Sequence, residues 1–233
     1  AGLGSLYIVS STRVKTEEDA DLTLAAGGTL EVRARRIEHE GGITVPSGTV
    51  NLYLVQNRTS STWTGADIDY VDLQERIYLG SGSVISVAGE TVDRTLVSSE
   101  REKVVSNSSV NGGSIILKDQ NPGGGSASTA EGVFVASGAV LDVSGGYVID
   151  KDGSISGGDA GDVTMQGKTV ALDGDLRGYS LSGNDGGTIT VYAKSVTVTS
   201  SGRTLPSGFG ADSGRLSFSI SLPRQRLWAP LRM

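Results

Sequence analysis

Short runs in which apolar and polar residues alternate recur along this chain of 233 residues. The clearest run begins at Gly161, and a second copy begins 26 residues later, at Gly187. Both copies place apolar residues at the second, fourth, ninth and eleventh positions after the glycine. Alternation with a period of two is typical of strands that bury one face. The pattern therefore predicts short β-strands, each introduced by a glycine.

Further copies extend this pattern over most of the chain. The same opening occurs at Gly28, Gly113 and Gly214. A second kind of repeat, two short apolar runs joined by Ser-Gly, covers residues 77–89 and recurs 56 residues later over 133–145. The openings at Gly113 and Gly161 are 48 residues apart. This spacing is close to two turns of about 24 residues each.

The repeat length indicates the fold class. A unit of about 20–27 residues holds three short strands and three turns, which is one rung of a parallel β-helix. Stacking each strand on an equivalent strand about 4.8 Å away pairs its backbone groups and buries its inward row. The sequence thus predicts an all-β parallel β-helix, a solenoid of about 20–27 residues per rung. An antiparallel sandwich or barrel, which also has short alternating strands, is the alternative.

Three polar stretches interrupt the repeats. We expect a single β-helix domain over residues 1–222, with inserted loops at about 56–76, 90–111 and 119–131. Residues 223–233 have a composition unlike the rest of the chain and are expected to form an irregular C-terminal tail. Insertions in repeat proteins cluster on one face and often bind partners.

The first insertion holds the candidate ligand-binding residues, which are Trp63, Asp67, Asp69 and Tyr70. The rings of Trp63 and Tyr70 could stack on sugars, and Asp67 and Asp69 belong to a cluster of carboxylates. A packing role for the aromatic rings is the alternative.

Charge and composition exclude several classes of function. The net charge is −6 and the isoelectric point is near 4.9. A nucleic-acid-binding protein needs a basic surface to neutralise phosphate, so we expect no nucleic-acid partner. The chain has no cysteine, which excludes disulfides, thiolate nucleophiles and cysteine-ligated metals. Because it does not begin with Met, we expect an internal fragment or a processed product.

Catalytic chemistry has little support in the residues. His39 is the single histidine, and a Ser-His-Asp triad would have to use it. It stands between Glu38 and Glu40 beside a predicted corner, so we expect an exposed loop residue. Glycosidase chemistry needs two carboxyl groups about 5–9.5 Å apart, which a sequence does not reveal. We therefore expect no enzyme activity and assign no catalytic residue.

A glycine-rich stretch with three carboxylates is a candidate calcium loop. Aligned with an EF-hand loop, Asp150, Asp152 and Asp159 take positions 3, 5 and 12. Val148 falls at position 1, where it cannot act as a ligand. The hypothesis is weak calcium binding by these three carboxylates, with no other cofactor. The alternative is a solvated turn in which Asp and Gly supply the turn geometry.

Three segments carry motifs of a known kind: Gly-Gly-Ser-Ile-Ile-Leu at 112–117, Gly-Gly-Thr-Ile-Thr-Val at 186–191 and Ser-Gly-Ala-Val-Leu-Asp-Val-Ser-Gly at 137–145. They resemble the repeats of the large exoproteins of bacterial two-partner secretion, the filamentous haemagglutinin-like group. The resemblance covers roughly residues 28–54 and 77–222. It identifies a type of repeat and not one particular protein.

This resemblance implies a right-handed β-helix, export through a partner outer-membrane transporter, and an extracellular location on the bacterial cell surface. It also implies an adhesive or filament role. The chain lacks the Asn-Pro-Asn motifs of the amino-terminal secretion domain of those exoproteins. It is therefore expected to be a segment of the shaft.

The predicted function is a non-enzymatic structural or adhesive segment of a secreted surface β-helix, with a cell-surface or carbohydrate ligand as the partner. One alternative is a carbohydrate-binding or carbohydrate-active module. Another is a self-assembling extracellular filament subunit that associates end to end, because the ends of a β-helix expose unpaired strand edges.

Overall fold

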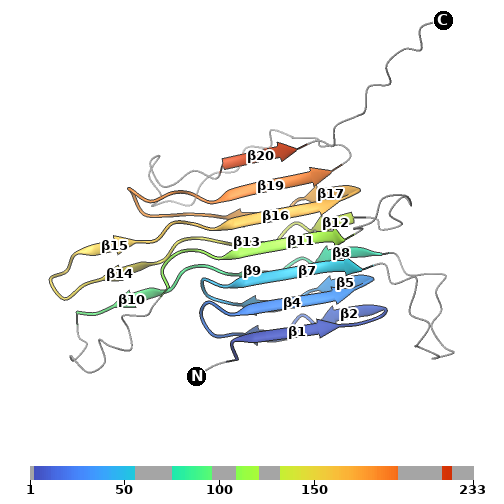
Figure 1. The fold of residues 1–233 in the computed structure, drawn as a ribbon, viewed down its shortest axis with the longest axis horizontal. Helices are drawn as coiled ribbons and strands as arrows, with labels where there is room; N and C mark the ends of the chain where they lie inside the picture. The colour runs from blue at the N-terminus through green and yellow to red at the C-terminus, as the bar shows by residue number, and fades with distance from the viewer. Residues whose placement is uncertain (1–2, 56–74, 96–108, 121–131, 194–216, 222–233) are drawn as a thin grey trace, which may run out of the picture.

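The structure is a computed structural model that describes residues 3–55, 75–95, 109–120, 132–193 and 217–221, the last range by its backbone. These residues form β-strands and no helix. The strands make three long parallel sheets and one small side sheet (Figure 1). The predicted all-β class with parallel pairing is confirmed, and the antiparallel alternative is wrong for the three long sheets.

The strands of each sheet follow in order of pairing. Sheet A contains β1 (Ser5–Val9), β4 (Thr29–Ala34), β7 (Thr49–Val55), β11 (Ser114–Gln120), β16 (Asp162–Gly167), β19 (Thr188–Ala193) and β20 (Ser217–Ser221). Sheet B contains β2 (Arg13–Thr16), β5 (Arg36–His39), β8 (Arg76–Leu79), β12 (Gly132–Val135) and β17 (Thr169–Leu172). Sheet C contains β3 (Asp21–Thr23), β6 (Gly42–Thr44), β9 (Val84–Ser86), β13 (Val140–Asp142) and β18 (Asp175–Arg177). The side sheet contains β10 (Thr91–Asp93), β14 (Tyr147–Ile149) and β15 (Ile155–Gly157).

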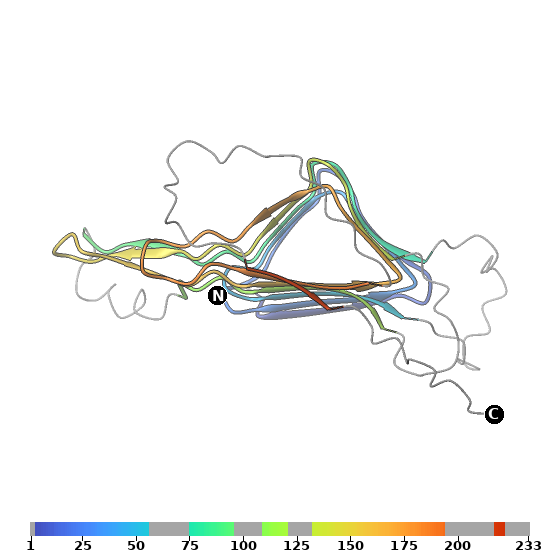
Figure 2. The same cartoon turned by 90° about the horizontal axis from the view of Figure 1, so that it is seen from above.

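The chain visits sheets A, B and C in turn, and we call one such passage a rung. Seen along the stack, the three sheets are the sides of a triangle, and the side sheet extends from one corner (Figure 2). Each strand pairs with the strand at the same place in the next rung. The arrangement is compatible with a β-helix or solenoid.

The observed register confirms two of the repeats. The 26-residue repeat is the pairing of β16 with β19, in which Val163 lies beside Ile189. The 56-residue repeat places Val133 beside Ile77. Repeats that align in sequence are therefore neighbours in space.

The 48-residue spacing has a different origin from the one predicted. β11 pairs directly with β16, with Ser114 beside Asp162, so one rung separates Gly113 from Gly161 and not two. Part of the additional length is the antiparallel hairpin of β14 and β15, which leaves the triangle and returns to it. Another part lies between β11 and β12, where residues 121–131 are outside the described residues. A stretch that reads as a Gly/Asp-rich loop thus contains two short strands.

The edges of the expected insertions also differ from the prediction. Arg76 already belongs to β8, Asp119 and Gln120 still belong to β11, and β10 lies inside the stretch 90–111. The remaining parts of these insertions, and the tail 223–233, lie outside the described residues.

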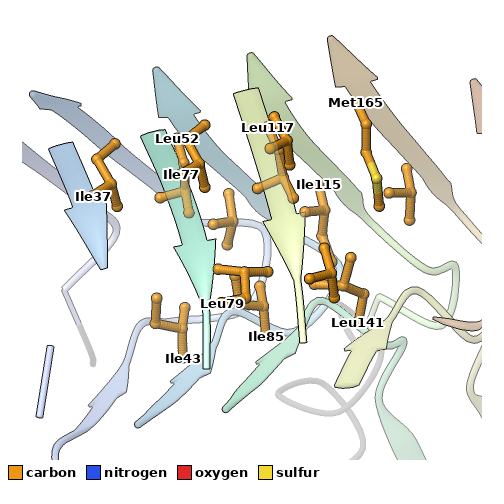
Figure 3. Packing of buried hydrophobic residues seen from close by; sticks show 14 of the residues in the cluster. Ile37, Ile43, Leu52, Ile77, Leu79, Ile85, Ile115, Leu117, Leu141 and Met165 are labelled. Carbon is orange, nitrogen blue, oxygen red and sulfur yellow. The ribbon is translucent and has the colours of Figure 1, made fainter. Parts of the chain in front are cut away.

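The core is the column of inward side chains inside the triangle. Alternate residues of β4 are buried, and Glu31, Thr164 and Thr190 point outward. The inward residues of successive rungs lie over one another (Figure 3). The fully buried members include Leu30, Leu52, Ile77, Leu79, Ile85, Ile115, Leu117, Leu141 and Met165. Because each rung buries its apolar row against the next, the core is continuous along the stack.

A column of glycines stands where each rung enters sheet A. A Cβ on Gly113 would lie 1.9 Å from the carbonyl oxygen of Gly48, and a Cβ on Gly161 would lie 1.8 Å from that of Gly113. Those same carbonyls accept hydrogen bonds from the next rung, from Ser114 at 2.9 Å and from Asp162 at 3.1 Å. The glycine that introduces each repeat is therefore required by the close approach of two backbones.

We expect Gly113→Ala to lower the free energy of unfolding by roughly 2 kcal/mol, because the new methyl group would push adjacent rungs apart. Gly4→Ala is the matched control, since a Cβ there meets nothing within 4 Å. Urea denaturation followed by circular dichroism measures both. Equal midpoints for the two variants would contradict the steric role of the glycine column.

Candidate functional site

The predicted ligand-binding residues Trp63, Asp67, Asp69 and Tyr70 lie outside the described residues, so their role stays a prediction. The structure does fix the two ends of this insertion. The chain leaves sheet A at the end of β7 and enters sheet B at Arg76.

The three carboxylates of the calcium hypothesis have other partners. Asp150 accepts a hydrogen bond from Nη1 of Arg94 at 3.1 Å. Asp152 accepts from the backbone N–H and the hydroxyl of Ser154 at 2.9 and 2.6 Å. These bonds, with that of the hydroxyl the strongest cause, lower the pKa of Asp152. Both carboxylates lie in the turn between β14 and β15.

Asp159 lies beyond the end of β15. It accepts hydrogen bonds from Nδ2 of Asn184 at 3.3 Å and from the backbone N–H of Asp185 at 2.9 Å. Within the described ranges no group of three or more His, Cys, Asp or Glu residues is placed to hold a metal ion. Calcium binding here stays a prediction, and it would require Asp150 and Asp159 to exchange their present partners for the ion.

The expectation for His39 is wrong. The side chain is 1% exposed and points into the core from β5, between Thr16 and Leu79 of the adjacent strands. Its Nε2 lies 3.2 Å from the carbonyl oxygen of Val84. Since a carbonyl oxygen only accepts, Nε2 carries the proton, and Nδ1 has no hydrogen-bond partner among the described residues.

Burial governs the ionisation of this histidine. Removal from water lowers the pKa of His39, and the weaker opposing effect is the hydrogen bond to Val84. The imidazole is therefore neutral and enclosed, and it cannot reach a substrate. Within the described residues the single histidine is thus unavailable as a general base.

The outer face of sheet B carries an ionic cluster around Glu38. Its carboxylate contacts the guanidinium groups of Arg36 on the same strand and of Arg13 on the neighbouring β2. It also lies 3.5 Å from Nη2 of Arg76 on β8. Burial alone would raise the pKa of Glu38. The hydrogen bond from Arg36 and the charges of Arg36 and Arg13 outweigh it and hold that pKa below its ordinary value. One carboxylate thus contacts guanidinium groups from three rungs, so the cluster links those rungs and stabilises the stack.

The outer face of sheet A is the widest regular surface among the described residues. Half of its described outward positions carry Ser, Thr, Asn or Gln, and the others include Tyr7, Tyr53 and Tyr192. Tyr7 is 65% exposed and Tyr192 is 42% exposed. The guanidinium of Arg33 lies over the ring of Tyr53, 5.8 Å from its centroid. This face therefore offers exposed aromatic rings and hydrogen-bonding groups to a partner.

Sequence reasoning missed this surface because it searched the insertions. The signal was present in the repeats themselves, where Tyr53 and Tyr192 occupy outward positions of glycine-introduced strands. Which outward residues lie side by side follows only from the pairing of the rungs.

Comparison with known proteins adds no relative: the chain matches no family model, no curated protein and no solved structure. Over the described ranges, no helix is long and apolar enough to cross a membrane.

The burial of His39 predicts a pH dependence of stability. Because its folded-state pKa lies below the ordinary value of 6.5, the unfolded chain takes up the proton first as the pH falls. The contribution of His39 to the free energy of unfolding is therefore fully present above pH 6.5. It declines as the pH drops toward the folded-state pKa. Each unit by which that pKa is lowered adds about 1.4 kcal/mol to the loss.

His39→Leu should remove this decline between pH 6.5 and about 5, since Leu79 occupies the adjacent inward position without a titrating group. Urea denaturation at several pH values measures it. The carboxylate of Glu38 contributes at lower pH, because its pKa lies below its ordinary 4.5. If the free energy of unfolding of His39→Leu fell with pH as steeply as that of the wild type between pH 6.5 and 5, the assignment to His39 would be refuted.

Proposed function

We propose that this chain is a right-handed parallel β-helix that serves as a structural and adhesive segment of a secreted bacterial surface protein, without enzyme activity. The observation that carries the proposal is the in-register stacking of rungs, which gives continuous outer faces along the stack. A stack of this kind extends a surface without needing a catalytic pocket. The resemblance of its repeats to those of filamentous haemagglutinin-like exoproteins supports the same role.

The same resemblance supports export through a partner outer-membrane transporter and an extracellular location on the cell surface. The absence of cysteine is consistent with that route, because such a chain forms no disulfide before it is exported.

A carbohydrate-binding or carbohydrate-active module is the second candidate. The outward tyrosines of sheet A favour binding, because exposed rings on a flat face stack well on sugar rings. The enclosed imidazole of His39 supports binding over catalysis.

End-to-end self-association is part of the proposal. Among the described residues, β1, β2 and β3 each lie at the edge of their sheet. Leu6 and Ile8 of β1 pack against the core and are only partly buried. An unpaired edge above a partly covered apolar row is a template for another strand.

Electron microscopy of the purified chain at two concentrations tests this function. We expect rods whose length grows with concentration, and no new reducing ends or unsaturated products when the protein is incubated with neutral and acidic polysaccharides. Compact particles, or turnover of a polysaccharide, would contradict the proposal.

A pair of variants on β1 separates self-association from rod shape. Ile8→Asp places a charge in the inward row of the first rung, and it should abolish lengthening while single chains stay folded. Val9→Asp is the matched control, because this neighbour is 74% exposed and points outward. Lengthening that survives Ile8→Asp would exclude this end as the contact.

A further inference from the structure

One outward column of sheet A combines aromatic rings with hydrogen-bonding groups. Five consecutive strands place these side chains in register: Arg33, Tyr53, Lys118, Gln166 and Tyr192. We call this set the tyrosine column. It runs along the stack, across strands that lie side by side in Figure 1.

The two rings of the column are separated by a fixed distance. Tyr53 and Tyr192 are three strand spacings apart, which is about 14 Å. Lys118 and Gln166 fill the two positions between them. This distance matches the length of a short oligosaccharide. The protein offers it an aromatic ring at each end and a hydrogen-bond donor at each of the two positions between.

Local contacts orient the first ring. Glu31 accepts a hydrogen bond from Nε of Arg33 at 2.6 Å, and the guanidinium of Arg33 lies over Tyr53. Arginine over an aromatic face is an attractive arrangement that restricts the ring. Tyr192, at the other end, is 42% exposed. The ring of Tyr53 is therefore restricted before a ligand arrives, and the ring of Tyr192 is accessible to solvent.

The charge of this face selects the kind of ligand. At the described outward positions of sheet A, Glu31 and Asp162 balance Arg33 and Lys118. The face is thus neutral in a chain whose net charge is −6. A polyanion would be repelled by the whole protein without compensation from this surface. Lys118 has no ion-pair partner among the described residues and can donate to hydroxyl oxygens.

We infer that the tyrosine column binds an uncharged polysaccharide that lies along the stack. Two of its sugar rings stack on Tyr53 and Tyr192, and hydroxyl groups between them bond to Lys118 and Gln166. This inference rests on the proposed adhesive role and gives it a ligand class and a site.

Affinity electrophoresis in gels that contain laminarin, galactomannan, xyloglucan or dextran tests the inference, with polygalacturonate as the acidic comparison. We expect at least one neutral polymer to retard the wild-type protein. Tyr53→Ala and Tyr192→Ala should each weaken that retardation about tenfold, since each removes one stacking contact. Tyr192→Phe keeps the ring and should bind like the wild type.

Tyr7→Ala is the matched control, because Tyr7 is more exposed, lies on the same sheet and falls in the neighbouring column beside Glu31. Its binding should be unchanged. The inference is overturned if no neutral polymer retards the protein, if only polygalacturonate does, or if the two alanine variants bind like Tyr7→Ala. Rods seen by electron microscopy in the same preparations would then leave the structural role standing, whereas compact particles would remove that role as well.

Discussion

The parallel hydrogen bonding between rungs is the interaction on which the rest of the structure depends. Each strand of sheets A, B and C is only a few residues long and gains its stability from the equivalent strand in the next rung. That pairing requires the backbones to approach closely at the corner before sheet A, where Gly48, Gly113 and Gly161 leave no space for a side chain. Once this contact is made, the register of all three sheets follows.

Register also determines what the surface can do. It stacks apolar rows inside the triangle and polar rows outside, so every outward position becomes part of a column. On sheet B the columns bring arginines from three rungs to Glu38, and the ion pairs of this cluster hold the rungs together. On sheet A the outward positions have no net charge and include two exposed rings, Tyr7 and Tyr192, and this is the face that we propose for binding.

The sequence predicts the architecture wherever the repeats are complete. Residues 161–172 and 187–198 share their glycine and apolar spacing, so their alignment anticipates the pairing of β16 with β19. The pairing of β11 with β16 was misjudged because a hairpin of two three-residue strands has too few alternating positions to be distinguished from a loop.

The candidate site was harder to predict because its neighbours are distant in sequence. His39 was expected in solvent because two glutamates flank it, yet Glu38 is covered by arginines that come from other rungs. Similarly, Tyr53 and Tyr192 belong to one column only because rungs of very different length pair in register. Alternation along one strand does not contain this information.

The most direct test of the account is a disulfide between two rungs that are 48 residues apart. Ile116 and Thr164 are in register on the outer face of sheet A, and the chain has no cysteine of its own. In the variant with Ile116→Cys and Thr164→Cys, adjacent strands place the two Cα atoms about 4.8 Å apart, within the range of a disulfide. We predict rapid intramolecular cross-linking under mild oxidation, detected as a mobility shift that reductant reverses. If an additional rung lay between β11 and β16, the Cα atoms would be about 10 Å apart and no cross-link would form, which would contradict the account.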